Sequence, residues 1–285
     1  MSNRLIIAKA QSEVRDIVSQ ARRDGKTIGF VPTMGALHDG HLSLVRRSNA
    51  EAGFTVVSIF VNPSQFGPNE DFNKYPRDIE KDSSFLENTV DLLFYPDVSE
   101  IYPDGFSTWI KPGKPARILE GKKRPGHFQG VCTVVLKLFE IVRPDIAYFG
   151  QKDAQQFVVL DRMVKDFNMP IKMVECPIVR ECDGLAMSSR NAYLNKHERS
   201  AAIIYNKALQ EALKLIESGE RNVSAVVEQI RKTIAEEPLA RLDYAEIVDS
   251  MNFQKIRRLR GTVYILITGF MGTTRLIDNI KVSID

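Results

Sequence analysis

The amino-acid sequence predicts an α/β fold, with a Rossmann-like parallel sheet in the N-terminal domain and a smaller α+β domain at the C-terminal end. Two observations predict the sheet. The run FTVVSIFV at 54–61 is apolar throughout, as in a parallel strand buried on both faces. Strand patterns also alternate with helix patterns, which is typical of a parallel sheet. Beyond Pro177 the pattern changes, so we predict domains at 1–177 and 178–285.

Apolar runs and helical spacing place the individual elements. In the N-terminal domain, strands are predicted at 5–7, 27–31, 54–61, 92–95, 146–149 and 171–174. Helices are predicted at 12–23, 79–88 and 131–142, together with one that begins near residue 41 and another that ends near residue 167. In the C-terminal domain, helices are predicted at 196–217 and 223–236, and strands near 242–248, 262–269 and 274–280. Ligands of parallel sheets bind beyond the carboxyl ends of the strands, so candidate site residues are sought there.

The composition indicates an enzyme-sized soluble protein. With 44% hydrophobic side chains among 285 residues, the chain can bury a substantial core. A net charge of +3 predicts no large basic surface for nucleic acid. No apolar run approaches the roughly 18 residues of a membrane span, and Cys132, Cys176 and Cys182 lack metal-ligand spacing. We therefore expect a cytoplasmic protein with no nucleic-acid or membrane partner.

The stretch FVPTMGALHDGHLSLVR at 30–46 carries the strongest chemical signal. An apolar run stops at Pro32, glycines break the chain, and His38 and His41 open an amphipathic helix. The free N–H groups at a helix N-terminus suit a nucleotide phosphate. Histidines three residues apart can both face one bound oxygen, where imidazolium donors would stabilise developing charge. The alternative is that one histidine only caps the helix or hydrogen-bonds in the core.

Polar residues after the next strand are further candidates. Asn62 and Gln65 could bind a small polar substrate, and an Asx turn is the alternative role, more so for Asn62. Asp82, on a predicted helix, could approach a metal-bound phosphate, although a lone helical aspartate is usually solvated. The stretch LEGKKRPGHFQG at 119–130 is predicted to be a loop that folds over an anion, or else a plain surface loop with solvated charges.

Two later stretches place cations near strand ends. The strand at 146–149 runs directly into GQKD at 150–153, which brings a glycine and a lysine to the sheet edge. At 187–191, the sequence MSSRN sets two hydroxyls beside an arginine, which matches phosphate oxygens. By itself this second pattern is more typical of a helix cap than of a phosphate site.

Taken in order, PTMGALHDGH, VNPSQF, YPRD, LEG..RPGHF, FGQKDAQQ and MSSRN resemble the motifs of the pantothenate synthetase (pantoate–β-alanine ligase) family, in the HxGH nucleotidylyl-transferase superfamily. The resemblance covers essentially the whole chain and ends with TTRLIDNI. It implies an ATP-dependent, AMP-forming condensation of (R)-pantoate with β-alanine to pantothenate, through a pantoyl adenylate, in coenzyme A biosynthesis. It also implies ATP as a substrate, Mg²⁺ as a cofactor and a homodimer.

The same resemblance implies a role for each candidate residue. The implied catalytic residues are His41, His38, Lys152 and Arg190. The implied ATP-binding residues are Met34, Gly35, Ala36, Leu37, His38, Asp39, Gly40, His41, Gly150, Gln151, Lys152, Asp153, Val179, Met187, Ser188, Ser189 and Arg190. Gln65 and Gln156 would bind pantoate, Gln65 also β-alanine, Arg124 and His127 would belong to a mobile loop, and Asp82 would bind Mg²⁺ through phosphates. Family members often carry glutamate in place of Gln151, a change that leaves Lys152 and Asp153 present.

Other functions remain open at this point. A plain nucleotidyltransferase would stop at an adenylylated product, and an aminoacyl-tRNA synthetase would need an RNA-binding surface that the near-neutral charge does not predict. A non-catalytic ATP-binding regulator would bind ATP without turnover. The candidate histidines, Lys152 and Arg190 favour an enzyme.

Overall fold

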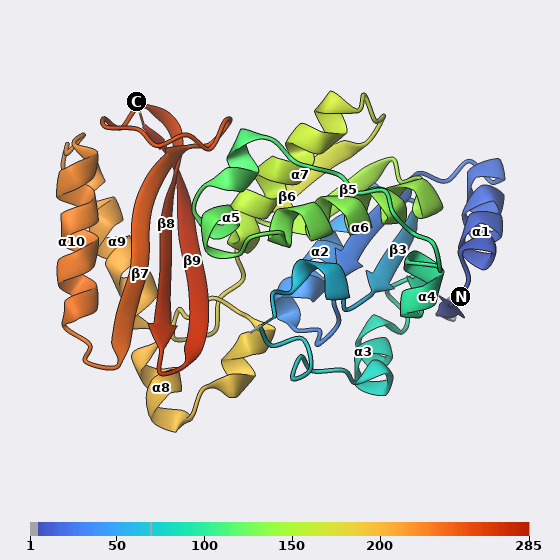
Figure 1. Cartoon of the computed structure of the whole chain (residues 1–285), viewed down its shortest axis with the longest axis horizontal. Coiled ribbons are helices and arrows are strands. Elements are labelled where there is room, and N and C mark those ends of the chain that lie inside the picture. The colour runs from blue at the N-terminus through green and yellow to red at the C-terminus, as the bar shows by residue number, and fades with distance from the viewer. Residues whose placement is uncertain (1–4, 69, 285) are drawn as a thin grey trace. The chain divides into compact units, whose positions relative to one another are not determined.

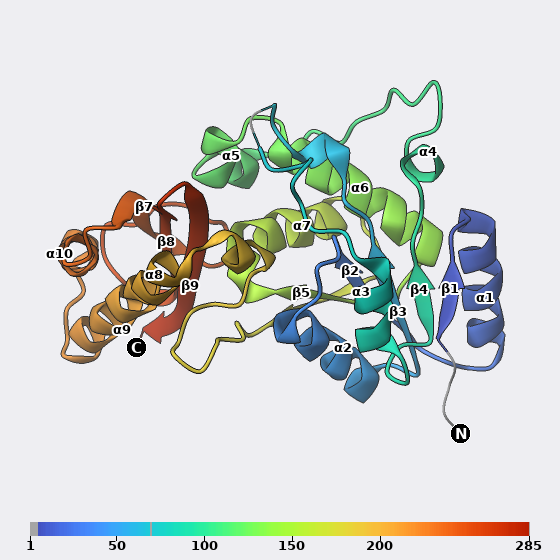
Figure 2. The same cartoon turned by 90° about the horizontal axis from the view of Figure 1, so that it is seen from below.

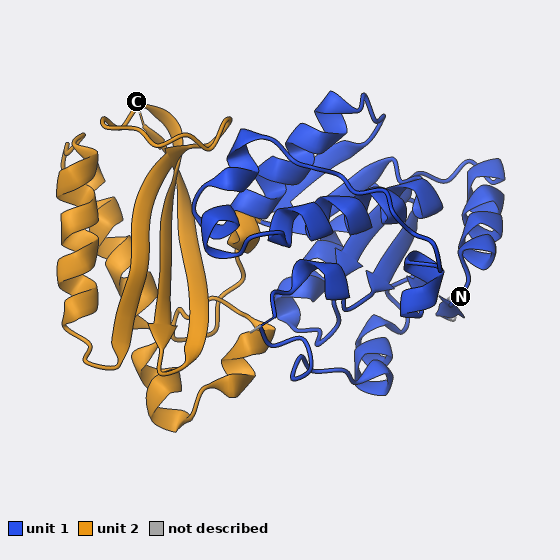
Figure 3. Ribbon diagram, in the orientation of Figure 1, with its two compact units in different colours: residues 1–150, 155–176 blue, residues 151–154, 177–285 orange. Residues whose placement is uncertain are grey.

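The protein divides into two compact units in a computed structural model that describes residues 5–68 and 70–284 (Figure 3). The N-terminal unit comprises residues 1–150 and 155–176. The C-terminal unit comprises residues 177–285 together with the short segment Gln151–Ala154. The chain therefore changes unit at 150/151, at 154/155 and at 176/177, and the second unit includes four residues that follow directly on a strand of the first.

A parallel sheet organises the described part of the N-terminal unit (Figure 1), and its strand order is β1-β4-β3-β2-β5-β6. Its strands are β1 (Ile6–Ala8), β2 (Ile28–Thr33), β3 (Phe54–Ile59), β4 (Leu92–Phe94), β5 (Ile146–Gly150) and β6 (Lys172–Cys176). Every residue of β3 is buried, as its unbroken apolar run predicts. The Rossmann-like sheet is thereby confirmed.

Helices cover both faces of this sheet (Figure 2). The α-helices in this part of the chain are α1 (Gln11–Arg23), α2 (Asp39–Glu51), α3 (Ile79–Leu86), α4 (Val98–Ile101), α5 (Glu120–Lys123), α6 (His127–Val142) and α7 (Ala154–Asp166). Apolar residues of α1, α6 and α7 form one core cluster with the sheet, and those of α2 and α3 form another. Burial of both apolar faces of the sheet is the main stabilising contribution.

The C-terminal unit is the expected α+β structure. Its antiparallel sheet has the order β7-β8-β9, with β7 at Ala240–Asp249, β8 at Gly261–Met271 and β9 at Thr274–Ile284. The helices are α8 (Lys196–Ala201), α9 (Ile204–Glu217) and α10 (Val223–Ala235). Buried residues of α9 and α10, such as Leu209 and Ile230, pack with Ile247 and Ile265 in one core.

The prediction of a loop at 119–130 is partly wrong, because the stretch contains α5 and the first turn of α6. Gly126 caps α6 in the left-handed region with φ 86°. A Cβ at Gly130 would lie 2.3 Å from the Ser64 carbonyl oxygen, so this glycine permits close packing rather than breaking the helix. That packing is tertiary, and local composition does not reveal it.

Two other boundaries differ from the prediction. The helix expected at 196–217 is split into α8 and α9, because the ladder shifts to an i to i+3 bond from Tyr205 N–H to Ala202 O. Strand β2 continues past Pro32 to Thr33, paired with β3, while its pairing with β5 involves only Gly29 and Phe30. None of the helices formed by residues 5–68 and 70–284 has the length and apolar character needed to cross a membrane.

Candidate active site

Strands β2 and β5 are neighbours at the point where the strand order reverses. From β2 the sheet extends through β3 and β4 on one side, and from β5 it extends to β6 on the other. Ligands of open parallel sheets bind at such a switch point, beyond the carboxyl ends of the strands. The loop that leaves β2 leads to His38 and His41 at the start of α2, and β5 ends at Gly150, directly before the turn Gln151–Asp153. The strand order therefore indicates, as a candidate ligand site, two of the stretches that the sequence motifs also indicate.

The loop between β2 and α2 is held by hydrogen bonds within the N-terminal unit. Gly35 and Ala36 have positive φ angles of 81° and 51°. The Gly35 N–H donates to Thr33 Oγ1 at 3.1 Å, and the N–H groups of Ala36 and Leu37 donate to the two oxygens of Asp82 at 2.9 and 2.8 Å. A Cβ at Gly35 would lie 2.9 Å from Asp82 Oδ2, so a larger residue at this position would be too close to the carboxylate.

Asp82 is buried, with 3% of its surface exposed, so the alternative of a solvated carboxylate is wrong. Burial raises the pKa of the Asp82 carboxyl, and its hydrogen bonds from Leu37 and Ala36 oppose that shift. Both oxygens already accept amide hydrogen bonds, and among the described residues no group of three or more His, Cys, Asp or Glu side chains could hold a metal ion. The described residues therefore do not form a metal cage of their own.

His38 and His41 each accept a backbone N–H at Nδ1. His38, the N-cap of α2, accepts from Gly40 at 3.1 Å, and His41 accepts from His38 at 3.4 Å. An amide can only donate, so a neutral ring in either position carries its proton on Nε2. The ring centroids are 4.2 Å apart, inclined at 43°. The pair can thus offer Nε2–H donors, whereas the predicted imidazolium would lose its hydrogen bond at Nδ1.

The start of α2 differs from the prediction of free amides at its N-terminus. The N–H of Gly40 is capped by His38, and those of His41 and Leu42 both donate to the His38 carbonyl oxygen, at 2.8 and 3.1 Å. The capping role considered as an alternative is confirmed for His38. It uses Nδ1 and the backbone carbonyl, so it does not compete with a ligand at Nε2.

Gln65 is held in place by its neighbours in the N-terminal unit. Asn62 Nδ2 donates to Gln65 Oε1 at 2.9 Å, and Gln65 Nε2 lies 3.0 Å from Met34 Sδ of the histidine loop. Asn62 itself is fully buried, and its Oδ1 accepts from the N–H and hydroxyl of Ser64 and from the Tyr102 hydroxyl. The Asx-turn role is thereby confirmed for Asn62.

A chain of polar contacts connects the 119–130 stretch to Gln65. Arg124 donates to both oxygens of Glu70, at 2.8 and 2.6 Å, and its Nη1 lies 3.1 Å from His127 Nε2. Because a guanidinium only donates, Nε2 accepts, and Nδ1–H donates to the Gln65 carbonyl oxygen at 2.9 Å. Burial, with the nearby Arg124 charge, lowers the pKa of His127 to about 4. Glu70, which the motifs did not single out, completes this network.

The turn Gln151–Asp153 belongs to the C-terminal unit, where Asn279 of β9 contacts its backbone. Asn279 Nδ2 donates to the carbonyl oxygens of Gln151 and Lys152, at 3.0 Å each, and Gln151 Nε2 donates to Asn279 Oδ1 at 3.1 Å. Asn279 is 2% exposed. The only sequence signal for it was its place in the TTRLIDNI motif.

The remaining predicted residues also lie in the C-terminal unit. Val179 accepts a backbone hydrogen bond from Met187 N–H at 3.0 Å, which holds the two segments together. Ser188 caps the short 3-10 helix Ser189–Tyr193 and accepts from the Arg190 N–H at 3.3 Å. The cap considered for this motif is therefore present, and Ser188 to Arg190 are half-buried.

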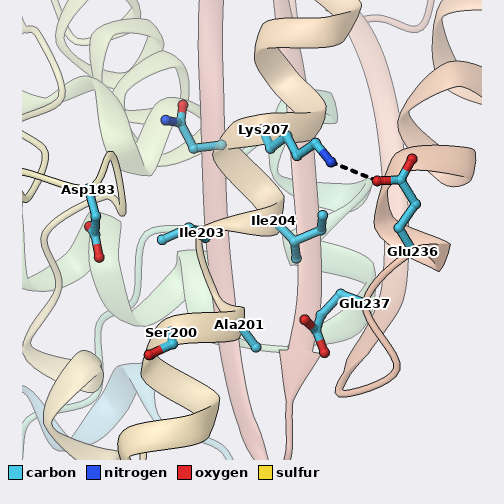
Figure 4. Close-up of a pocket in the computed structure, with 9 residues that line it drawn as sticks. Asp183, Ser200, Ala201, Ile203, Ile204, Lys207, Glu236 and Glu237 are labelled. Carbon is cyan, nitrogen blue, oxygen red and sulfur yellow. Dashed lines mark hydrogen bonds and ion pairs between the residues drawn. The ribbon is translucent and has the colours of Figure 1, made fainter.

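The structure thus groups the candidates by unit. The N-terminal unit holds Met34 to His41, Gln65, Asp82, Arg124, His127, Gly150 and Gln156, and the C-terminal unit holds Gln151 to Asp153, Val179 and Met187 to Arg190. A separate cavity of about 500 Å³ in the C-terminal unit has an ion pair, Lys207–Glu236, among its lining residues (Figure 4). It is lined by none of these candidates.

The fold and the strand-end motifs define a protein of the α/β class with its candidate site at the switch point of a parallel sheet. Comparison with known proteins specifies the family. Residues 6–281 match the family model described as pantoate-beta-alanine ligase. A pantothenate synthetase from Caldicellulosiruptor saccharolyticus is 54% identical over 98% of this chain and 100% of its own length, and one from Thermosipho africanus is 56% identical over 94% and 96%.

Solved structures agree with this assignment. Pantothenate synthetase from Thermus thermophilus has a TM-score of 0.92 at 42% identity, covering 96% of this chain and 98% of that one. Pantoate-beta-alanine ligase from Francisella tularensis, complexed with beta-gamma ATP and beta-alanine, has a TM-score of 0.75 at 37% identity and covers 97% of both chains. The chain belongs to the pantoate–β-alanine ligase family. It is an enzyme of pantothenate biosynthesis that joins pantoate to β-alanine with ATP.

Proposed function

We propose that ATP and pantoate react at the carboxyl ends of β2 and β5, where His38, His41, Lys152 and Arg190 stabilise the developing charge. The position of β2 beside β5 at the switch point is the observation that carries this proposal. One strand leads into the histidine loop and the other into the lysine turn. Met34 to His41, Gly150 to Asp153, Val179 and Met187 to Arg190 are the proposed nucleotide contacts.

The proposed reaction has two steps. The pantoate carboxylate attacks the α-phosphorus of ATP, an acyl–phosphate bond forms, and the bond to pyrophosphate breaks. The neutral amine of β-alanine then attacks the acyl carbon, an amide bond forms, the amine loses a proton and AMP leaves. The first step brings two anions together, so fixed cations and N–H donors are needed. The Nε2–H groups of His38 and His41, whose Nδ1 atoms already accept backbone hydrogen bonds, would supply such donors.

Gln65 and Gln156 are the proposed pantoate contacts, and Gln65 also contacts β-alanine. The amide of Gln65 is already oriented by Asn62 beside Met34, so it is preorganised to accept and donate to a small hydroxy acid. The segment from α5 to the start of α6, with Arg124 and His127, is the proposed mobile cover. It would keep water from an adenylate that hydrolyses readily.

Magnesium is proposed to arrive with the nucleotide. Mg²⁺ usually keeps several waters and binds one or two carboxylates together with substrate phosphates. The lone carboxylate of Asp82 fits that pattern better than a protein cage, although its oxygens already accept two amide hydrogen bonds. Bound to the phosphates, the ion would neutralise part of their charge. A cytoplasmic location and a homodimer are proposed on the family resemblance alone.

A coupled AMP-release assay tests the proposal, with pantoate and β-alanine supplied separately and together. We expect AMP release only with both, and ATP/pyrophosphate exchange with pantoate alone. A plain nucleotidyltransferase would instead release pyrophosphate with one acid and accumulate the adenylylated product. AMP release that is indifferent to β-alanine would refute the two-step ligation.

A further inference from the structure

Asn279 makes three side-chain hydrogen bonds to the turn that carries Lys152. Both Nδ2 hydrogens go to backbone carbonyls, of Gln151 and Lys152, and Oδ1 accepts from the Gln151 side chain. The amide orientation follows from this pattern, because only the NH₂ group can donate to two carbonyls. Leu276 and Ile280 of β9 pack on the core of the C-terminal unit. Asn279 therefore lies on the opposite face of the sheet.

Asn279 is itself held by the neighbouring ion pair between Arg180 and Asp278. Arg180 donates to both oxygens of Asp278, at 2.7 and 2.9 Å, and the Asp278 carboxylate accepts from the Asn279 N–H at 2.7 Å. Asp278 is 5% exposed. A bidentate pair between a guanidinium and a buried carboxylate has a defined geometry, so it restrains this part of β9.

We propose that Asn279 is a positioning residue for Lys152, and that it fastens the lysine turn to β9 of the C-terminal unit. Lys152 follows β5 in the chain, but its turn is part of the C-terminal unit, where Asn279 of β9 donates hydrogen bonds to it. A lysine on a flexible stem has little geometric preference of its own. The two carbonyl contacts restrict the backbone from which that stem projects. This inference rests on the proposed role of Lys152 in the reaction.

A double-mutant cycle tests the inference in the full-length enzyme. Asn279→Asp keeps the size and one acceptor of the amide but turns both donors into acceptors, and Asn279→Ala removes all three contacts. Each is expected to lower kcat about ten- to a hundred-fold, because displacing a catalytic group by about 1 Å can cost that much. In a Lys152→Ala background, the same changes are expected to alter kcat less than about twofold, since coupled sites are not additive.

The control is Leu276→Ala on the same strand, which removes core packing without touching the turn. It is expected to lower the melting temperature and to leave kcat within about twofold in either background, as expected for uncoupled sites. If Asn279 served only stability, its effects on kcat would follow those of Leu276. Additive effects of Asn279→Ala and Lys152→Ala on kcat would overturn the positioning role.

Hydrogen exchange supplies a readout that needs no catalysis. Peptides covering 150–156 are expected to exchange faster in Asn279→Ala than in wild type, and at wild-type rates in Leu276→Ala. Unchanged exchange in Asn279→Ala would overturn the inference even if turnover fell. Wild-type turnover in Lys152→Ala would remove Lys152 from the proposed function, while the exchange result would still decide whether Asn279 holds the turn.

Discussion

At the scale of single residues, several side chains shape the site before any substrate is present. His38 caps α2 through Nδ1, and Asp82 holds the two amides that a phosphate could otherwise have used. The loop amides engaged by Asp82 and His38 are therefore structural, and the ligand would meet side-chain donors instead. His38 thus caps the helix through Nδ1 and would contact the ligand through Nε2, so a substitution can remove one role and keep the other.

Two substitutions of His38 should separate capping from catalysis. Asn is a strong N-cap and can accept from Gly40 as Nδ1 does, but it cannot supply the Nε2–H donor. We expect His38→Asn to keep the free energy of unfolding within about 0.5 kcal/mol of wild type, and His38→Ala to lose about 1 kcal/mol. Both should lose turnover, measured by AMP release. Normal turnover in His38→Asn would restrict His38 to capping.

At the scale of elements, the α5–α6 segment depends on charge as well as on packing. Arg124 pairs with Glu70, and neutral His127 connects that pair to the Gln65 backbone. Protonation of His127 would place a cation against the Arg124 guanidinium and remove the acceptor at Nε2. The α5–α6 segment should therefore be most stable when the imidazole of His127 is neutral.

The pH dependence of stability follows from the pKa of His127, which is lowered from 6.5 to about 4 in the folded protein. Between these values the unfolded chain binds more protons, so stability is complete above pH 6.5 and falls as the pH drops towards 4. The loss amounts to about 3 kcal/mol. We expect His127→Asn, which keeps a donor near Gln65, to flatten this part of the profile in denaturant titrations. Equal slopes for both proteins would contradict the assignment.

At the scale of the whole molecule, the proposed machinery is divided between the two units. His41 belongs to the N-terminal unit and Lys152 to the C-terminal unit, although Lys152 is only two residues beyond the end of β5. The chain changes unit on both sides of the Gln151–Ala154 segment. Catalysis as proposed therefore needs both units intact.

Removing either charge-stabilising group should have a large and similar effect. His41→Ala and Lys152→Ala are each expected to lower kcat by about 100- to 1,000-fold, the usual effect of losing one preorganised donor, or about 2.7 to 4 kcal/mol. Far-ultraviolet circular dichroism should show unchanged folding in both. A variant that retained near-complete turnover would exclude that residue from the mechanism.

The sequence by itself determined the α/β class, the buried strand that begins at Phe54, the helix that begins beside His38 and His41, and the family, because periodicity and ordered motifs are local properties of a chain. Only the tertiary structure decided that Asp82 is buried against loop amides, that Arg124 pairs with Glu70, that α6 begins at His127, and that the lysine turn packs on Asn279. These contacts join residues distant in sequence, 46 positions apart for Asp82 and Ala36 and 127 for Asn279 and Lys152. No local pattern encodes such pairs, because their hydrogen bonds form only once the sheet has brought the segments together.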